Sequence, residues 1–236
     1  MHLLSTNAND LRFPPVEHAS PEGLLAVGGD LRCERLLAAY RRGIFPWYND
    51  GQPILWWCPD PRAVLFPSKL IVSRSLRKTL RAEKYRVTLD CSFSQVVAEC
   101  AAPRAQYPGG GTWITNEMAA AYAALHNLGY AHSVETWQGE RLVGGLYGVA
   151  LGGIFFGESM FARERDASKV AFVHLVRQLD AWGFRLIDCQ IGSAHLASLG
   201  AEEIPRTAFI EQLQDALALP GVAGPWTFEL DSSLIA

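Results

Sequence analysis

The stretch GGIFFGESMFARERDASKVAFVHLVRQLDAWGFRLIDCQ, residues 152–190, predicts two short strands joined by a long helix. Residues 153–157 are an apolar, aromatic run between glycines, which is typical of a buried strand. Residues 166–182 carry apolar side chains at helical spacing, and Asp166 is expected to cap the start of this helix. Residues 186–190 form the second predicted strand. A strand, a helix and a strand therefore make up the centre of the fold.

Two carboxylates follow these apolar strands. Glu158 comes directly after the first strand and is followed by Ser159, whereas Asp188 lies near the end of the second strand, two residues before Gln190. A carboxylate that leaves an apolar strand loses water, so it must find a partner, titrate abnormally or take part in chemistry. Two readings stay open: Glu158 caps a strand end while Asp188 binds loop amides, or both belong to an active site.

Working outward, apolar periodicity predicts further helices and strands on both sides of this centre. We expect helices at 30–42, with Asp30 as the cap, and at 94–101, 117–128 and 206–217; strands at 86–90, 131–137 and 141–149; and a strand-like piece at 226–230. The strands at 131–137, 141–149 and 153–157 are separated by short turns and predict an antiparallel meander. The proline-rich stretch 59–67 marks a domain boundary. The predicted fold class is α+β, with a small N-terminal α+β domain at 1–62 and a larger domain at 63–236 whose sheet is mixed and mainly antiparallel.

The bulk composition excludes several classes of protein. The chain has 236 residues, of which 49% are hydrophobic, and its apolar runs are shorter than a membrane span requires. No secretory signal is visible near the start. Five scattered cysteines form no C-x-x-C pair and six histidines form no H-x-x-x-H pair, which argues against a disulfide framework or a metal site and for a reducing cytoplasm. We expect no cofactor, no metal and no membrane contact.

The charge is unevenly distributed along the chain. Residues 69–86 hold seven bases and one acid, a net charge of +6, whereas the remaining 14 bases and 23 acids give −9. A merely solvated helix face usually alternates its signs, and this segment does not. The segment therefore predicts a local contact with a polyanion on an otherwise acidic protein.

Aromatic side chains gather between prolines at 44–48 and 54–62. Proline-rich loops hold aromatics rigidly, which suits stacking on a nucleic-acid base, and Trp47 is the strongest candidate. The alternative is that these tryptophans are core residues. The glycine-rich loop 107–113 lacks the G-K-[ST] sequence of a phosphate-binding loop, so it is weak evidence for nucleotide binding.

Two classes of enzyme can be compared with the sequence around Glu158 and Ser159. A serine hydrolase is disfavoured because residues 157–161, GESMF, lack the second glycine of G-x-S-x-G. The order helix, meander, helix, strand is also that of the GCN5-related N-acetyltransferase (GNAT) fold, whose members bind coenzyme A on a glycine-rich turn before the helix. Here that turn is 159–166, SMFARERD, with no glycine and two acids, so the fold is retained but coenzyme A is disfavoured.

Seven strings along the chain resemble the leucyl/phenylalanyl-tRNA–protein transferase family. They are GLLAVGGDL (23–31), GIFPW (43–47), WWCPDPR (56–62), GTWIT (111–115), GESMF (157–161), LIDCQ (186–190) and SLGAEEIPR (198–206). The strings occur in order and span almost the whole chain, and several are long enough to be specific.

The resemblance implies a cytoplasmic, bacterial aminoacyltransferase with a GNAT-like C-terminal domain. It would move Leu, Phe or, less well, Met from aminoacyl-tRNA to proteins whose N-terminal residue is Arg or Lys, and so mark them for degradation by the N-end rule pathway. We expect a monomer. The alternatives are a coenzyme-A-dependent N-acyltransferase of the same fold and a noncatalytic module that binds tRNA or peptides.

The resemblance also implies roles for individual residues. Asp188 would anchor and help deprotonate the acceptor amine, Gln190 would bridge toward the ester, and Glu158 would position the donor. The apolar donor pocket would consist of Leu146, Phe155, Met160 and Leu175. The terminal adenosine would pack against Trp47 and Trp113, assisted by Tyr122, and Arg74, Lys78 and Arg81 would bind tRNA phosphates. A relay through the terminal ribose hydroxyl stays open, as does the identity of the carboxylate that binds the acceptor's basic side chain.

Overall fold

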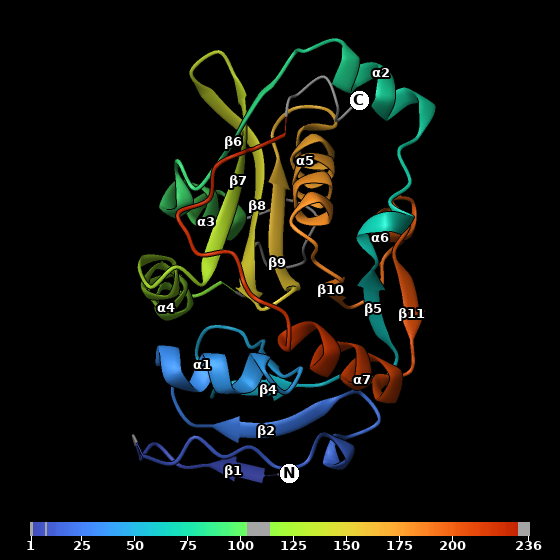
Figure 1. The fold of residues 1–236 in the computed structure, drawn as a ribbon. Helices are drawn as coiled ribbons and strands as arrows, with labels where there is room; N and C mark the ends of the chain where they lie inside the picture. The colour runs from blue at the N-terminus through green and yellow to red at the C-terminus, as the bar shows by residue number, and fades with distance from the viewer. Residues whose placement is uncertain (1, 8, 103–113, 231–236) are drawn as a thin grey trace.

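The computed structural model of the chain describes residues 2–7, 9–102 and 114–230, and within them the strands form two sheets (Figure 1). The small sheet has the order β1-β2-β4-β3, and the large one has the order β11-β5-β10-β9-β8-β7-β6. The small sheet consists of β1 (His2–Leu4), β2 (Leu24–Gly28), β3 (Phe45–Pro46) and β4 (Leu55–Trp57). The large sheet consists of β5 (Arg62–Leu65), β6 (Arg86–Leu89), β7 (Ala131–Gln138), β8 (Arg141–Leu151), β9 (Ile154–Ala162), β10 (Leu186–Gln190) and β11 (Glu202–Ile204). The fold is therefore α+β, as predicted.

The helices cover the sheets from several sides. They are α1 (Cys33–Tyr40), α2 (Arg74–Arg81), α3 (Phe93–Ala101), α4 (Asn116–Asn127), α5 (Ala167–Ala181), α6 (Ala194–Ala197) and α7 (Arg206–Leu217), with short 3₁₀ turns at Val16–His18 and Pro67–Lys69. None of the described helices is both long enough and apolar enough to cross a membrane.

The large sheet is mixed. Strands β7, β8 and β9 form the predicted antiparallel meander, and β10 then adds parallel to β9 after the α5 crossover. Strands alternate their side chains between the two faces. Accordingly Phe155 packs in the core with α5, whereas Phe156 packs in the other core with α3, α4 and Tyr40. The predicted order of helix, meander, helix and strand is confirmed.

The two sheets share one continuous core. The same cluster of buried side chains contains Trp56 of the small sheet, Tyr147 of the large sheet and Phe209 of α7. Helix α7 lies against the N-terminal part (Figure 1), and a Cβ added at Gly43 would come within 2.6 Å of the Phe209 ring. The division at 1–62 and 63–236 stays a prediction, and Arg62 itself opens β5.

Three local predictions differ from the structure. Asp30 does not cap α1, which begins at Cys33; its carboxylate instead accepts from the backbone N–H of Arg32 and pairs with Arg35. Asp166 precedes α5 in the left-handed conformation at φ 62°, where its side chain bonds Thr79 rather than the helix amides. No strand forms at 226–230, where the backbone N–H groups of Glu229 and Leu230 donate to the Gln178 side chain and that of Trp226 donates to Asp90.

Candidate active site

A cavity opens where β9 and β10 separate. The two strands pair in parallel only as far as Phe156 and Asp188. Beyond that point β9 follows β8 and β10 follows β5, and each of these ladders contains one bulge. Glu158 is the extra residue in the β9 bulge, and Cys189 is the extra residue in the β10 bulge. A bulge redirects side chains and ends regular pairing, so this pair of bulges creates the gap and lines it with polar groups.

The cavity has a volume of about 220 Å³ and mostly apolar walls. Its carboxylates and amide lie where the two strands diverge. Leu146 and Phe155 come from the face of the sheet that packs against α5, and Phe172 comes from α5 itself. The full lining is Leu146, Tyr147, Phe155, Gly157, Glu158, Ser159, Met160, Phe172, Ile187, Asp188, Cys189, Gln190, Ser193, His195 and Leu196. A pocket of this kind orients an apolar group beside a few polar atoms.

Asp188 is fully buried and bound by a cation. Arg62 donates from Nε to Oδ1 at 2.8 Å and from Nη2 to Oδ2 at 2.7 Å, which is a bidentate pair. The guanidinium also lies over the rings of Phe45 and Phe209, at 4.9 and 4.5 Å from their centroids. Burial alone would lower the pKa of Arg62, but the charge of Asp188 outweighs it and the pKa is raised. The pair with Asp188 therefore favours the charged form of Arg62.

Glu158 is buried among neutral donors. The hydroxyls of Tyr40 and Tyr122 donate to its two carboxylate oxygens at 2.7 and 2.6 Å, and Gln190 Nε2 donates at 3.0 Å. Burial, together with the charge of Asp188, raises the pKa of Glu158 from 4.5 to about 7, against the three hydrogen bonds that lower it. Glu158 can thus gain or lose a proton near neutral pH.

Gln190 connects the two carboxylates. Its backbone N–H donates to Asp188 Oδ1 at 2.9 Å while its side-chain amide donates to Glu158. The residue adopts φ 62°, a left-handed conformation that is unfavourable for a side chain of this type. The surrounding hydrogen bonds hold it there, and such conformations occur often at functional sites.

Of the four residues predicted for the donor pocket, three line the cavity. They are Leu146, Phe155 and Met160. Leu175 is fully buried in the core on α5 and is absent from the cavity wall, where Phe172, one turn earlier on the same stripe, takes part instead. The helical spacing contained both residues, but only the packing of α5 on the sheet selects Phe172.

The residues predicted to contact adenosine lie in different settings. Trp47 is 41% exposed, next to Tyr48, whose hydroxyl lies 3.5 Å from Thr115 Oγ1 at the start of α4. Tyr122 is fully buried and bonds Glu158, so its hydroxyl already has a partner. Trp113 lies outside the described residues.

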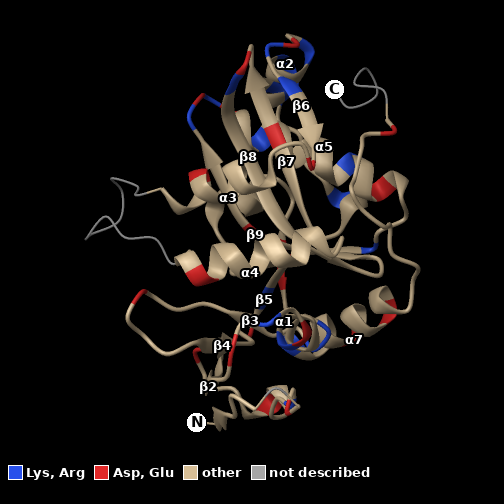
Figure 2. Cartoon of the chain, turned by 90° about the vertical axis from the view of Figure 1, so that its left-hand side faces the viewer, with Lys and Arg blue, Asp and Glu red and all other residues tan. Residues whose placement is uncertain are grey.

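The predicted tRNA contacts all lie on α2. Arg74, Lys78 and Arg81 are exposed, and α2 lies at the far end of the molecule from the small sheet (Figure 2). Within the described ranges these three side chains form no ion pair, whereas Lys69 pairs with Glu202 and Lys84 with Glu164. The basic face of α2 is thus available to an outside anion.

Two residues of the centre carried no sequence signal. Tyr40 was expected on the apolar side of a helix, and Arg62 was one letter in a proline-rich string. Their partners lie 118 and 126 residues further along the chain. No local periodicity can connect positions so far apart.

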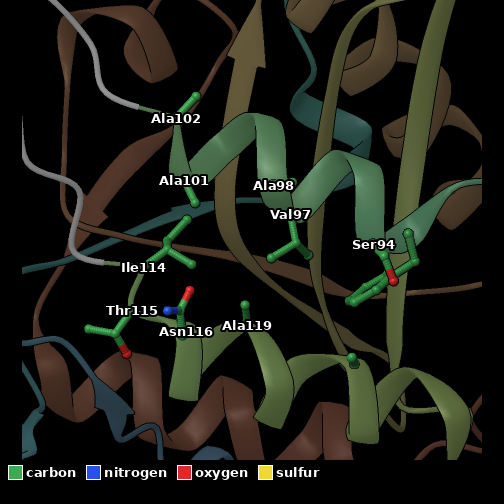
Figure 3. Close-up of a pocket in the computed structure, with 11 residues that line it drawn as sticks. Ser94, Val97, Ala98, Ala101, Ala102, Ile114, Thr115, Asn116 and Ala119 are labelled. Atoms are coloured by element: carbon green, nitrogen blue, oxygen red, sulfur yellow. The ribbon is translucent and has the colours of Figure 1, made fainter.

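A second cavity, of about 400 Å³, lies between α3 and α4 (Figure 3). Small and apolar side chains such as Val97, Ala101 and Ile114 face it, and none of its described lining residues is ionisable. The described part of its lining therefore offers no acid–base group, unlike the cavity beside β9 and β10. No cluster of three or more potential metal ligands exists in the parts of the chain that the structure describes. The carboxylate cavity is therefore the candidate active site.

Comparison with known proteins agrees with the pattern of strings. The family model described as leucyl/phenylalanyl-tRNA protein transferase matches residues 64–214, and the model of that family's N-terminal domain matches residues 29–60. Proteins named leucyl/phenylalanyl-tRNA–protein transferase are similar at high identity. That of Nitrosomonas europaea is 57% identical over 229 residues, covering 96% of each chain, and that of Stutzerimonas stutzeri is 61% identical over 217 residues, covering 91% of this chain and 95% of the relative.

Solved structures are similar at lower levels. L-PGS from Bacillus licheniformis matches with a TM-score of 0.38 and 13% identity, covering 72% of this chain and 54% of that one. A GCN5-related N-acetyltransferase from Kribbella flavida matches with a TM-score of 0.37 and 11% identity, covering 71% and 59%. The family models and the relatives decide the assignment. This chain belongs to the leucyl/phenylalanyl-tRNA–protein transferase family and is an aminoacyltransferase.

Proposed function

We propose that the protein transfers leucine, phenylalanine or methionine from aminoacyl-tRNA to the α-amino group of proteins that begin with Arg or Lys, in the cytoplasm and as a monomer, and so marks them for N-end rule degradation. The observation that supports this most is the apolar cavity at the strand separation, with Glu158 and Gln190 at its polar end. Walls of Leu, Met and Phe accept unbranched or γ-branched side chains and discriminate weakly among them.

The reaction is aminolysis of an activated ester. The acceptor nitrogen attacks the carbonyl carbon, a C–N bond forms, the C–O bond to the ribose breaks, and the amine proton goes to the departing ribose oxygen. Positioning and charge stabilisation contribute most to such a step. Two groups can carry the amine proton on its way to the ribose oxygen. One is a neighbouring ribose hydroxyl, and the other is Glu158, whose pKa is about 7.

In this scheme Asp188 does not touch the reacting atoms and acts by positioning Gln190. Its two oxygens are already bound by Arg62 and by the Gln190 backbone, so it holds Gln190 in place. Gln190 then presents its amide at the cavity. Asp188→Asn should lower transfer strongly while leaving tRNA affinity unchanged.

Coenzyme A is a poorer donor for this site. The turn between β9 and α5 contains Glu164 and Asp166, and these acids lie where a pyrophosphate would meet the helix N-terminus. A Cβ added at Gly144 would come within 2.6 Å of Ala167 Cβ, so the sheet packs closely against the first turn of α5. An ester on tRNA needs no such pyrophosphate site.

The basic face of α2 supports a role for tRNA as the donor. Arg74, Lys78 and Arg81 lie on one exposed helix and can bind phosphates without reading sequence. The triple alanine variant should bind tRNA more weakly, and the slope of log affinity against log salt should fall by about 2–3. Arg12→Ala, an exposed base near the N-terminus, is the control. An unchanged slope in the triple variant would remove α2 from the interface.

The decisive test is transfer of radiolabelled leucine from charged tRNA, without coenzyme A, to two peptides that differ only in an N-terminal Arg or Ala. We expect label on the Arg peptide alone. Labelling that requires an acyl-coenzyme A would instead assign the site to the coenzyme-dependent reaction. Intact tRNA binding without transfer from either donor would favour the noncatalytic module.

A further inference from the structure

The two carboxylates of the centre are already occupied. Asp188 is held by both donors of the Arg62 fork, and Glu158 by two tyrosine hydroxyls and the Gln190 amide. A second cation that approached Asp188 would meet the charge of Arg62. An acceptor guanidinium or ammonium that bound either group would have to enter a buried site and share a carboxylate that already accepts three hydrogen bonds, which is costly for a charged group.

A third carboxylate lies beside this centre without a partner. Strand β11 carries two adjacent acids, both exposed. Glu202 pairs with Lys69, whereas the carboxylate of Glu203 accepts no hydrogen bond and forms no ion pair within residues 2–7, 9–102 and 114–230. An exposed carboxylate without a partner can bind a cation from solution.

The register of the sheet places Glu203 close to the catalytic amide. Ala63 of β5 pairs with Gln190 on one side and with Glu203 on the other. The Glu203 side chain reaches back across β5, because a Cβ added at Gly192 would collide with its Oε1 atom. Gly192 lies in the turn between Gln190 and Ser193, which both line the cavity. The Glu203 carboxylate thus lies against the backbone of Gly192, at the rim of the cavity.

We propose that Glu203 binds the basic side chain of the acceptor's N-terminal residue and thereby determines the preference for Arg and Lys. The assignment rests on the proposed function. The α-amino group would lie in the cavity near Gln190, and the extended side chain would run over the 190–193 turn to the Glu203 carboxylate. The glycine at 192 leaves room for this carboxylate, and a partly exposed pair with Arg gains from bidentate hydrogen bonding.

The test compares peptides that begin with Arg and with citrulline, which has nearly the same shape but no charge. kcat/KM for each peptide is measured at saturating leucyl-tRNA with the full-length enzyme. The variants are Glu203→Gln and, as the matched control on the same strand, Glu202→Gln. We expect the wild-type preference for Arg over citrulline to fall about tenfold in Glu203→Gln, through KM for the Arg peptide, and to be retained in Glu202→Gln. The KM for leucyl-tRNA should not change in either variant.

A second variant moves the carboxylate while keeping its charge. Gly192→Ala should push Glu203 away from the turn and lower the preference for the Arg peptide by a smaller factor than Glu203→Gln does. A Glu203→Gln enzyme that is folded by circular dichroism and keeps the full Arg preference would overturn the assignment. A wild-type enzyme that transfers equally well to Arg and citrulline peptides would instead refute the basic-acceptor rule of the proposed function.

Discussion

Asp188 and Glu158 are two buried carboxylates that are stabilised by different kinds of partner. Both carboxylates are buried, and they lie on neighbouring strands of one sheet. Asp188 is matched by a cation in a bidentate pair, whereas Glu158 is surrounded by two phenols and an amide. Burial raises the pKa of Glu158 to about 7, although the hydrogen bonds from its neutral donors lower it. The comparison shows how one site combines an ion pair with a carboxyl group that can exchange a proton near neutral pH.

The largest expected effect concerns the ion pair. Arg62→Met keeps an apolar side chain between Phe45 and Phe209 but leaves Asp188 buried without a counterion, so the free energy of unfolding should fall by about 3–5 kcal/mol. Urea denaturation would measure this. Arg163→Ala, which breaks the exposed pair with Glu99, is the control and should cost less than about 1 kcal/mol. Adding Asp188→Asn to Arg62→Met should restore part of the loss; no recovery would argue against an unpaired charge as its cause.

The next effect is the pH dependence of stability contributed by Glu158. Its folded pKa of about 7 lies above the ordinary value of 4.5, so the folded state binds the extra proton between these limits and stability falls as the pH rises through them. The penalty is absent below pH 4.5 and reaches on the order of 3 kcal/mol at pH 8. Glu158→Gln should therefore be more stable than the wild type at pH 8 and lose that advantage at pH 4.5. Thermal unfolding at both pH values would show it, and equal differences at the two would contradict the raised pKa.

The smallest expected effect is that of removing the hydrogen bond from Tyr40 to Glu158. Tyr40→Phe removes a donor that stabilises the charged form of Glu158, so the pKa of Glu158 should rise further and unfolding free energy should drop by about 1 kcal/mol. Carbon-13 NMR of labelled glutamate, with Glu158→Gln to assign the signal, would report the titration. Tyr147→Phe is the matched control, because the Tyr147 hydroxyl is buried and has no hydrogen-bond partner in the described part of the chain. A shift of equal size in both variants would rule out a specific role for the Tyr40 bond.

Much of the architecture followed from local patterns. The meander, the α5 helix and the β10 strand were predicted to within a few residues, because alternation and helical spacing are properties of contiguous segments. The first strand was predicted to end at Gly157, yet β9 runs on to Ala162 through a bulge at Glu158. A bulge depends on the register of the neighbouring strand, which a single segment does not contain.

By itself, the sequence determined the fold class, the basic segment on α2 and the presence of Glu158, Asp188 and Gln190 near the ends of apolar runs. The seven strings that resemble the transferase family indicated the reaction, which is aminoacyl transfer. Only the tertiary structure decided which group each carboxylate meets, since Tyr40 and Arg62 reach them from more than a hundred residues away. It also decided that Phe172 rather than Leu175 faces the cavity. The Glu203 carboxylate, which has no partner among the described residues, lies beside Gly192 at the cavity rim. Burial and pairing arise from contacts between distant segments, and these contacts set the pKa and the chemistry of every group in the site.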